Sequence, residues 1–504
     1  MLENLLLGFE YVIIPFNFLC IVIGSLLGII VGAMPGMHAS TVIILLTPLT
    51  IYFNSVPAFL LSVAIYCGEL FGGSITAILF RTPGTSVAMV TAFDGYEMTK
   101  KGKAGEALGV AIYSSAIGGL LSVLAMITII PFLSKVAIGF GPAEFCALAI
   151  MGLSLISCLC QSSHIKGLIM ALTGILFATV GLDHITGVER LTFNLPSLRL
   201  GINIVIVLLG ILPLGEVFKV IIDQIGNKNQ KKNVIKNLPK VKIPSFLNIK
   251  NLLLKYKITL LKSSIIGTLI GILPGAGGTL ATFLSYGEAV RSSKHPEEFG
   301  TGTPEGVLAA EAANNASSGG SMIPLLTLGI PGSETTAILL SLLVLHGIKP
   351  GPMLLFEAPE LVYSSFIGMT ISNILIIFMG IGLSGLFLNL LKVHKSYTYS
   401  LIFVFCIIAA FNLRNSWTDV WMLFIFGFFG YFLQKYKWPI GPLVLGLVLG
   451  NLLEDSFRRA LLIYNGDFLI FFKLPISAIM LFIAIGSFLL PIIKLAINKF
   501  SKQS

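Results

Sequence analysis

The chain has 504 residues, of which 55% are hydrophobic and only 11% are charged, and its formal net charge is +10. Soluble globular domains carry about 25% charged residues, so this composition excludes a water-soluble protein. The apolar segments are continuous rather than alternating, and at about 20 residues each they can cross a bilayer as helices but do not resemble barrel strands. We therefore expect an all-α integral membrane protein.

The segments that we expect to cross the membrane follow one another along the chain. No Lys or Arg precedes the first of them, as a cleaved signal peptide would require, so we expect it to be retained as a helix. Two segments, 39–53 and 279–289, are too short to cross and are expected to be re-entrant or broken helices. With some half-spans, about eleven or twelve transmembrane helices result. The expected spans are 11–31, 57–80, 105–131, 143–160, 165–181, 200–222, 258–273, 306–330, 360–391, 398–412, 416–434, 438–452 and 475–497.

Two sequence motifs occur twice, in the same order. The first, Gly-x-x-x-Gly-x-x-Pro-Gly, covers residues 28–36 and returns 239 residues later at 267–275. The second leads from Gly-Gly-Ser to Pro-Gly and a hydroxyl residue, at 72–85 and again at 319–333. Two motifs that recur in one order indicate two homologous halves.

A basic loop joins these halves. Residues 228–262 contain ten Lys and no acid. Such a run could contact nucleic acid, but basic residues collect in the cytoplasmic loops of membrane proteins, and we favour that interpretation. The expected domains are a first membrane repeat, 1–222, a basic cytoplasmic connecting loop, 223–257, and a second membrane repeat, 258–504.

The charges of equivalent connectors predict how the repeats are oriented. The connector after the first motif is uncharged in the first half, at 51–57, but basic in the second half, at 291–295. The connector after the second motif shows the reverse, with three Lys at 100–103 and one at 346–349. Because positive charge marks the cytoplasmic side, equivalent connectors lie on opposite faces, as in an inverted-topology repeat.

Proline-glycine pairs interrupt four of the apolar segments. Proline removes a backbone donor and clashes with the preceding turn, so a helix breaks there and leaves polar backbone groups unpaired. In hydrocarbon such groups are tolerated only where protein, water or a ligand satisfies them. Helix kinks with close glycine packing are the alternative explanation for each break. The pairs are Pro35-Gly36, Pro83-Gly84, Pro274-Gly275 and Pro331-Gly332.

Small polar residues follow each break and predict a substrate site. Ser and Thr are typical N-cap residues, and a half-helix that starts in the break would direct its N–H groups and positive dipole end towards an anion. Four such starts could converge on a carboxylate-bearing substrate. The residues expected to bind it are Pro35, Gly36, His38, Ser40, Thr41, Arg81, Pro83, Gly84, Thr85, Ser86, Pro274, Gly275, Gly277, Gly278, Thr279, Pro331, Gly332, Ser333 and Thr335.

A polar stretch at 311–318 lies inside an apolar segment. Its Asn and Ser oxygens suit Na⁺, whereas Glu311 could instead carry a proton; a water-lined seam of hydrogen bonds between helices is the alternative. The coupling-ion candidates are Glu311, Asn314, Asn315 and Ser317. Apart from a coupling Na⁺ or H⁺, we expect no cofactor and no metal site.

Charged residues inside the membrane are rare and usually functional. Glu69 and Arg81 are twelve residues apart and could pair with each other. Arg81 could equally bind a substrate carboxylate with its bidentate guanidinium, or extend from a helix end towards water. Asp94 belongs with the Lys cluster at 100–103 to an expected cytoplasmic turn.

Motifs of enzymes are missing from the sequence. It contains no HExxH, GxSxG, Walker loop or paired acidic metal motif, and its six cysteines form no CxxC pair. We therefore expect a protein that is not an enzyme.

Four long stretches carry a resemblance to a known family. They are 28–47, 72–109, 267–286 and 299–352, roughly a third of the chain. In these stretches the chain resembles the large membrane subunit, the TctA-type permease, of the tripartite tricarboxylate transporters. The family motif residues present here are Pro35, Gly36, Pro83, Gly84, Asp94, Gly95, Pro274, Gly275, Glu311, Asn314, Asn315, Pro331 and Gly332.

The resemblance implies a secondary transporter of the bacterial cytoplasmic membrane that imports a carboxylate such as citrate. It implies two partners, a small four-helix membrane subunit and a periplasmic solute-binding protein, and a Na⁺ or H⁺ gradient as the driving force. It also implies an elevator-type carrier, in which a core with broken helices moves against a scaffold.

Three charged residues depart from the family's pattern, which has neutral residues at these positions. They are Glu69, Arg81 and Glu334. We expect them to mark a different carboxylate substrate or a modified coupling. Two other functions remain open, namely a stand-alone secondary carrier for amino acids or other organic anions, and an intramembrane enzyme or scaffold.

Overall fold

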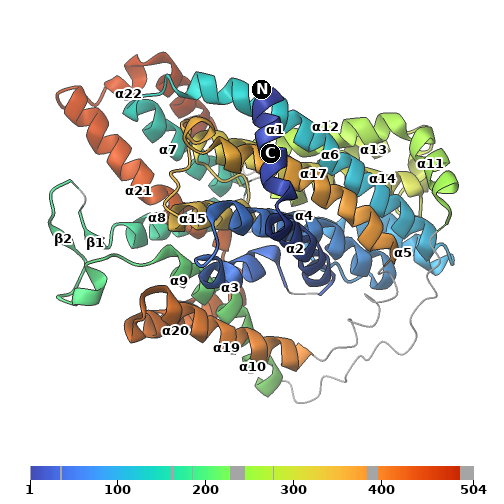
Figure 1. Ribbon diagram of the computed structural model, residues 1–504, viewed down its shortest axis with the longest axis horizontal. Coiled ribbons are helices and arrows are strands. Elements are labelled where there is room, and N and C mark those ends of the chain that lie inside the picture. Colours follow the sequence, from blue (N-terminus) through green and yellow to red (C-terminus); the bar gives the residue numbers. More distant parts are fainter. Residues whose placement is uncertain are drawn as a thin grey trace, which may run out of the picture. The chain divides into compact units, whose positions relative to one another are not determined.

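The computed structural model describes residues 2–34, 37–159, 164–183, 185–226, 244–275, 277–382 and 395–487 (Figure 1). Regular structure in these ranges is helical apart from one antiparallel hairpin, β1 (Gly181–Leu182) with β2 (Glu189–Arg190). Six described helices are long and apolar enough to cross a membrane: Pro15–Ala33, Ser55–Phe80, Ala104–Ala137, Ile204–Asp223, Pro359–Gly382 and Ile440–Ile463. Six shorter apolar helices accompany them, and about eleven or twelve spans require these to contribute. The expected all-α membrane protein is confirmed.

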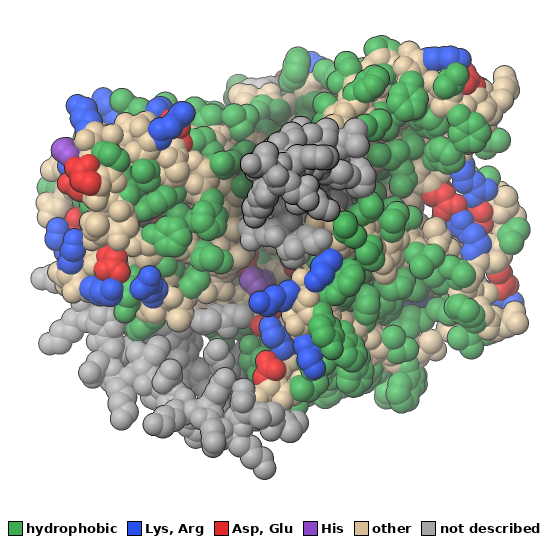
Figure 2. Space-filling model, turned by 180° about the vertical axis from the view of Figure 1, so that it is seen from behind, with side chains coloured by type: hydrophobic (Ala, Val, Ile, Leu, Met, Phe, Trp, Pro, Cys, Tyr) green, Lys and Arg blue, Asp and Glu red, His purple; other side chains and the backbone are tan. Residues whose placement is uncertain are grey.

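The surface of the described residues is apolar over wide areas. Leu124, Leu269 and Phe378 are each more than half exposed, together with many other large hydrophobic side chains. On the face shown in Figure 2, hydrophobic side chains cover broad areas and the charged side chains gather in a few groups. Soluble monomers rarely expose apolar patches of this extent, so lipid is the medium that suits these helices.

The chain forms two compact units, each built from two separate parts of the sequence. Unit 1 comprises Met1–Ser134 and Asn227–Leu401, and unit 2 comprises Lys135–Gly226 and Ile402–Ser504. Each unit therefore takes one segment from before the basic loop and one from after it. The sequence repeats 1–222 and 258–504 remain a prediction, since these units divide the molecule in space rather than along the chain.

Unit 1 contains the broken helices. Before the basic loop it has α1 (Leu2–Ile13), α2 (Pro15–Ala33), α3 (Ala39–Thr50), α4 (Ser55–Phe80), η1 (Ser86–Met89), α5 (Thr91–Lys100) and most of α6 (Ala104–Ala137). After the loop it has α11 (Phe246–Lys255), α12 (Lys257–Ile272), α13 (Gly277–Ser292), η4 (Pro296–Glu298), α14 (Pro304–Leu328), α15 (Glu334–Leu345), α16 (Leu354–Glu357), α17 (Pro359–Gly382) and the start of α19 (Lys395–Arg414).

The central helices of unit 1 are α4 and α14, which are buried along almost their whole length. Glycines let a neighbouring helix approach each of them closely. A β-carbon at Gly28 or Gly32 of α2 would collide with the backbone of α4, and Figure 1 shows these two helices side by side. A β-carbon at Gly267 or Gly271 of α12 would collide with the backbone of α14 in the same way. Both copies of the first motif therefore pack their helix closely on one of the two central helices.

Unit 2 contains the remaining helices. They are α7 (Pro142–Leu159), α8 (His164–Ala178), η2 (Pro196–Leu198), α9 (Ile204–Leu209), the π-turn η3 (Gly210–Leu214), α10 (Gly215–Gly226), α20 (Trp417–Lys435), α21 (Ile440–Ile463), α22 (Ile470–Lys473) and the apolar helix Pro475–Ser487. Gly174 and Gly446 let α8 and α21 pack backbone to backbone. The loop with the β-hairpin is joined to α21 by Asp183, which is 2.6 Å from the guanidinium of Arg458.

The structure corrects two of the expected helices. The expected span 11–31 is divided at Ile14, because Pro15 begins α2 as its first residue, a position where the missing N–H of proline has no cost. The half-helix α15 is absent from the expected spans. The two segments expected to be too short to cross are confirmed as the short helices α3, with 12 residues, and α13, with 16 residues.

Candidate functional site

Helices α4 and α14 end in the same way, just before a Pro-Gly pair. Arg81 caps α4 with a left-handed backbone (φ 56°), and Gly329 caps α14 with a left-handed backbone (φ 70°). In both turns the N–H of the cap residue donates to the carbonyl four residues earlier, and the next N–H reaches back six residues. These bonds satisfy carbonyl groups that a helix end would otherwise leave unpaired.

The glycines of these Pro-Gly pairs are held against backbone. A β-carbon at Gly84 would overlap the carbonyl oxygen of Gly32, and one at Gly332 would crowd the carbonyl oxygen of Gly271. The Gly84 N–H donates to the Gly73 carbonyl at 3.2 Å. The alternative of close glycine packing therefore applies at both breaks, and it does not exclude a site, since it holds both turns rigidly.

Of the other two Pro-Gly pairs, only the one in the second half of the sequence, Pro274-Gly275, lies within the described residues. Gly275 has a left-handed backbone (φ 74°), and its N–H donates to the carbonyl of Gly332 at 3.0 Å. The first half's equivalents, Pro35 and Gly36, lie outside the described residues. Pro274 stands in the turn between α12 and α13, where the chain breaks as expected.

Two pairs of helix starts meet across the halves of the sequence. In the first, η1 meets α13, and the Ser86 hydroxyl lies 3.1 Å from the Thr279 hydroxyl. We call this the neutral pair, because its residues carry no ionisable side chain. Its members are Thr85, Ser86, Gly277, Gly278 and Thr279.

The second pair of helix starts, α3 with α15, has the opposite character, and we call it the acidic pair. The Glu334 side chain lies close to Ser40, His38 and Glu69. His38 Nδ1 is 3.5 Å from Glu69 Oε1. We define the acidic pair as His38, Ser40, Ser333 and Glu334 together with Glu69, which projects from α4.

The start of α15 is fixed by a capping box. The Ser333 hydroxyl accepts from the Thr336 N–H, and the Thr336 hydroxyl accepts from the Ser333 N–H. Thr336 makes this capping contact, as the position three residues after an N-cap does in this motif. The prediction that the neighbouring Thr335 binds substrate stays a prediction. Thr41, also expected at the site, is buried in the first turn of α3.

Arg81 lies away from the acidic pair. Glu69 and Arg81 are twelve positions apart, which is about 18 Å along a helix, so of the possibilities left open for Arg81 the pairing with Glu69 does not form. Glu69 pairs with His38 instead. Arg81 is exposed, and its guanidinium lies 5.9 Å from the centre of the Tyr96 ring.

Glu311 is a completely buried carboxylate that receives three hydroxyl hydrogen bonds. Ser74 of α4 donates to it at 2.5 Å, Ser115 of α6 donates at 2.8 Å, and Thr91 of α5 donates to the same oxygen as Ser74. The carboxylate thus ties α14 to three helices of the first half. Ser74 belongs to the repeated Gly-Gly-Ser motif. Thr91 and Ser115 were not singled out from the sequence, because each looks like an ordinary buried hydroxyl residue.

The amides one turn further along α14 are buried without full hydrogen bonding. Asn314 donates to the Leu70 carbonyl at 3.0 Å. Among the described residues, its side-chain oxygen, both polar side-chain atoms of Asn315, and the Thr85 hydroxyl have no partner. Buried polar atoms nearly always have a partner, so these atoms are available to bind an ion or water. The Ser317 hydroxyl, by contrast, donates to the Asn314 carbonyl.

Asp94 is placed differently from the expectation of a simple turn. Its carboxylate accepts from the N–H groups of Gly302 and Thr303, at 2.8 and 3.0 Å, and from the Tyr286 hydroxyl at 2.8 Å. A carboxylate at a helix start satisfies unpaired N–H groups and favours the helix dipole. Asp94 of α5 therefore anchors the start of α14.

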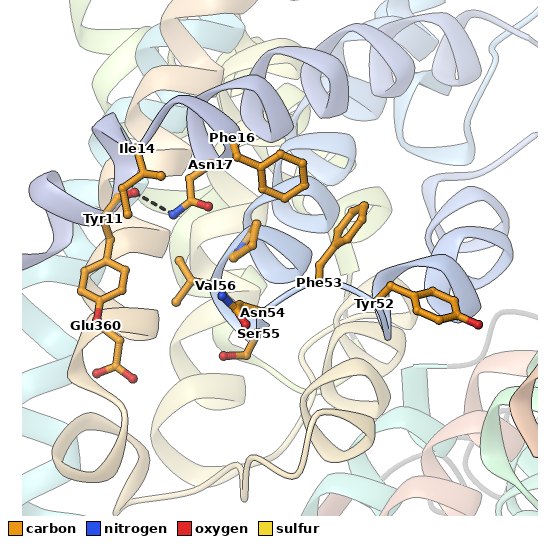
Figure 3. A pocket seen from close by; sticks show the side chains of 11 residues that line it. Tyr11, Ile14, Phe16, Asn17, Tyr52, Phe53, Asn54, Ser55, Val56 and Glu360 are labelled. Carbon is orange, nitrogen blue, oxygen red and sulfur yellow. Dashed lines mark hydrogen bonds between the residues drawn. The ribbon is translucent and has the colours of Figure 1, made fainter.

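The described residues also line a cavity of about 790 Å³ away from the helix starts. It lies between α1, α2, the connector that leads into α4, and Glu360 of α17 (Figure 3). At its edge the Asn17 amide donates to the Tyr11 carbonyl at 2.7 Å. None of the residues expected to bind substrate or ion lines this cavity.

Comparison with known proteins identifies the family. The model of the tripartite tricarboxylate transporter TctA family matches residues 18–445. An uncharacterized 52.8 kDa protein in the TAR-I ttuC' 3' region of Agrobacterium vitis is 37% identical over 96% of this chain and 95% of its own length. An uncharacterized protein in the TAR-II ttuC' 3' region of that organism is 40% identical over 43% of this chain and 89% of its own length. No solved structure matches. This chain, a multi-pass membrane protein, belongs to the TctA family of tripartite tricarboxylate transporters.

Proposed function

We propose that this protein is the permease of a secondary active transporter that imports a carboxylate across the bacterial cytoplasmic membrane. The substrate is a tricarboxylate such as citrate or a related organic acid, and a Na⁺ or H⁺ gradient drives its uptake. The observation that carries this proposal is the neutral pair, where helix starts from both halves of the sequence meet without any acid.

The neutral pair has the chemistry of a carboxylate subsite. The helix α13 has 16 residues, and the first N–H groups of an α-helix have no partner within it. These groups and the positive end of the helix dipole attract an anion. The hydroxyls of Ser86 and Thr279 add two donors beside them, and the space beside Gly277 is open, since a β-carbon there would meet no atom within 4 Å.

The incompletely bonded amides of α14 suit a coupling cation. The Asn314 side-chain oxygen, the Asn315 amide and the Thr85 hydroxyl are oxygen ligands of the kind that Na⁺ takes in transporters with broken helices. Thr85 belongs to the neutral pair as well, which would couple ion binding to carboxylate binding. Glu311 is already bonded to three hydroxyls, so we assign it to holding the helices together rather than to the ion.

The repeat and elevator proposals draw on two further observations. The two copies of both motifs make matching contacts, at Gly32 with Gly84 and at Gly271 with Gly332. All four Pro-Gly pairs fall within the residues of unit 1. We propose that unit 1 is the moving transport core of an inverted-repeat elevator carrier and that unit 2 is its scaffold.

Two partners complete the proposal. Because the family is tripartite, we propose that a periplasmic solute-binding protein delivers the carboxylate and that a small four-helix membrane subunit associates with the permease. The large cavity near α1 is not assigned to either partner.

Uptake of radiolabelled citrate and a panel of dicarboxylates into proteoliposomes tests the function. The full chain would be reconstituted with its small subunit, with and without the binding protein, under inward Na⁺ or pH gradients. Gradient-driven uptake that requires the binding protein is the expected result. Uptake without the binding protein would favour a stand-alone carrier, and no uptake of any panel member by folded protein would contradict carboxylate transport.

A further inference from the structure

The neutral and acidic pairs are built from equivalent positions of the two repeated motifs. Ser40 and Thr279 each stand five residues after the proline of the first motif, and Ser86 and Glu334 each stand three residues after the proline of the second. In space, Ser86 meets Thr279, and Glu334 meets Ser40. The same two positions therefore meet twice, with one hydroxyl replaced by a carboxylate in the acidic pair.

The difference between the pairs extends to their surroundings. Glu69 and Ala316 each stand three residues before the Gly-Gly of the second motif, and His38 and Gly277 each stand three residues after the proline of the first. Three ionisable side chains thus gather at the acidic pair where the neutral pair has none. These ionisable side chains are not needed to bring two helix starts together, because the helix starts of the neutral pair meet without them.

The ionisable groups of the acidic pair have no strong cation to balance them. The Glu69 carboxylate is 5% exposed, and its ion-pair partner in the described residues is His38, whose side chain is 45% exposed. The Glu334 side chain is exposed to solvent. Two carboxylates therefore share one imidazole, and the negative charge exceeds the positive.

The helices packed around these groups bring few other titratable side chains to them. Among the described residues, α2 and α3 contain no acidic or basic side chain, α14 faces the pair with Ser321, and α4 adds the titratable groups Tyr66 and Cys67. The Tyr66 hydroxyl lies 3.3 Å from the Ser333 hydroxyl. Arg81 is at the far end of α4, so no guanidinium or ammonium reaches the acidic pair from these elements.

A second observation points to a ligand at the acidic pair. The Ser321 hydroxyl is completely buried behind Gly332, and the Tyr66 hydroxyl beside it does not meet it with the geometry of a well-formed hydrogen bond. A buried hydroxyl without a well-formed hydrogen bond indicates that water or another hydrogen-bonding group completes the site. Such a water would connect the buried Tyr66 and Ser333 hydroxyls with solvent and provide a path for protons.

We propose that His38, Glu69 and Glu334 form the proton-binding site of this transporter, and that a proton is bound there while the carboxylate is carried. This inference rests on the proposed function. A proton from the outer solution converts a carboxylate of the pair to a neutral carboxyl group, and its release on the inner side restores the carboxylate. No bond other than O–H forms or breaks.

The chemistry favours a proton over other ligands. A carboxylate of the substrate would be repelled by Glu69 and Glu334 unless a proton neutralised one of them. In the described residues no three His, Cys, Asp or Glu side chains are arranged to hold a metal ion. Coupling follows directly, because the protonated pair has lost the charge that repels an anion at the transport core.

Infrared spectroscopy of the purified full-length chain would test the site without transport. The band of protonated carboxyl groups is followed as the pH is lowered, in the wild type and in Glu334→Ser, which introduces the side-chain type of the neutral pair. Glu334→Gln keeps the shape if the serine variant does not fold, and Glu97→Gln is the matched control, because Glu97 is a partly exposed carboxylate of α5 that pairs with Lys100. We expect a pH-dependent band that both Glu334 variants lose and that the control keeps.

Uptake in proteoliposomes then tests the coupling. Each unit of pH difference should raise the accumulation of labelled citrate, or of the dicarboxylate that is transported, about tenfold per coupled proton. Glu334→Gln should lose this response. A band unchanged in the Glu334 variants, or accumulation in Glu334→Gln that responds to pH as the wild type does, would overturn the proposal even with carboxylate uptake intact. A band lost as expected, without uptake of any carboxylate, would uphold the proton site and count against the proposed function.

Discussion

The neutral pair and the acidic pair show how one backbone arrangement can serve two kinds of chemistry. Both consist of a helix start from each half of the sequence, and both are held by a glycine packed against backbone, Gly84 in one and Gly332 in the other. The side chains differ, with hydroxyls alone at the neutral pair and two carboxylates and an imidazole beside the hydroxyls of the acidic pair. The helix η1 of the neutral pair is also a short 3-10 helix, whereas its counterpart α15 is an α-helix. The fold thus fixes where helix starts meet, and a few side chains decide whether an anion or a proton suits the place.

A methyl group added at Gly84 or Gly332 should disrupt the backbone contact that holds each pair, and we expect this change to have the largest effect on stability and transport. In Gly84→Ala the new β-carbon would overlap the Gly32 carbonyl, and in Gly332→Ala it would crowd the Gly271 carbonyl. Overpacking of this kind costs about 1–3 kcal/mol, and transport should be lost in both variants. Thermal unfolding in detergent measures the stability, and uptake measures the transport.

Gly287→Ala is the matched control for these substitutions. Gly287 lies inside α13, and a β-carbon there would meet no atom within 4 Å. Because alanine favours a helix interior by about 1 kcal/mol over glycine, this variant should be as stable as the wild type or more so. Equal stability of Gly332→Ala and Gly287→Ala would contradict the role given to the Pro-Gly turns.

Placing a carboxylate in the neutral pair should remove its difference from the acidic pair. In Ser86→Glu the added charge would face a bound carboxylate, and two like charges about 4 Å apart near a protein surface repel by up to about 4 kcal/mol before screening. We expect carboxylate binding to weaken at least about tenfold. Ser86→Gln, whose side chain has the same size but no charge, should weaken carboxylate binding less. Equal loss of binding in the two variants would show that charge is not the cause.

The caps of α4 and α14 allow a smaller and sharper test. Arg81 has the left-handed backbone that Gly329 has in the other half. That conformation costs a non-glycine residue about 1–2 kcal/mol, which glycine avoids. Glycine instead loses about 0.5–1 kcal/mol more conformational entropy on folding, which offsets part of the gain. Arg81→Gly should therefore stabilise the protein by about 0.5 kcal/mol, and Gly329→Ala should destabilise it.

Arg81→Asn separates the backbone role of this residue from a role in selecting substrate. Asn tolerates the left-handed conformation but has no charge. If Arg81 selects a carboxylate, Arg81→Asn should change the preference among citrate and the dicarboxylates in the uptake assay. Unchanged uptake and unchanged preference would leave Arg81 as a cap beside Tyr96 and remove it from the substrate site.

Much of unit 1 could be predicted from the sequence because its signals are local. Apolar length predicts α4 and α14, and proline followed by glycine predicts the breaks after them, since each effect acts within a few residues. The repeated motif also indicates where α13 begins. The division at Ile14 was missed although Pro15 marks it, because the surrounding segment is uniformly apolar.

The pairing of helix starts could not be predicted, because it depends on how distant segments pack. His38, Glu69 and Glu334 are far apart in the sequence, and each alone looks like an unusual charge in an apolar segment. Which of them meet is decided by the faces that α3, α4 and α15 present to one another. The anchoring of α14 by Asp94 was missed for the same reason, as its partners lie about two hundred residues away.

A carboxylate in unit 2 supplies the last test, because it has the strong cation that Glu69 and Glu334 lack. The hydrogen bond from Arg458 holds the pKa of Asp183 well below its usual range, and the N–H groups of Ile185 and Thr186 add to the effect. A carboxyl group whose pKa is lowered by folding stabilises the fold above the pKa of the unfolded chain, about 3.9 for aspartate, and loses that contribution as the pH falls towards the folded value. Asp183→Asn should therefore lower the unfolding temperature in detergent at pH 7, and the difference from the wild type should shrink under acid conditions.

The same variant should leave the pH dependence of uptake unchanged, because Asp183 stays ionised throughout the range in which transport is measured. Glu334→Gln should do the reverse, changing the pH dependence of uptake more than the unfolding temperature. If instead Asp183→Asn altered the response of uptake to a pH gradient as strongly as Glu334→Gln does, the proton would not be bound at the acidic pair alone. The contrast then separates a carboxylate that is kept charged for stability from one that changes charge during transport.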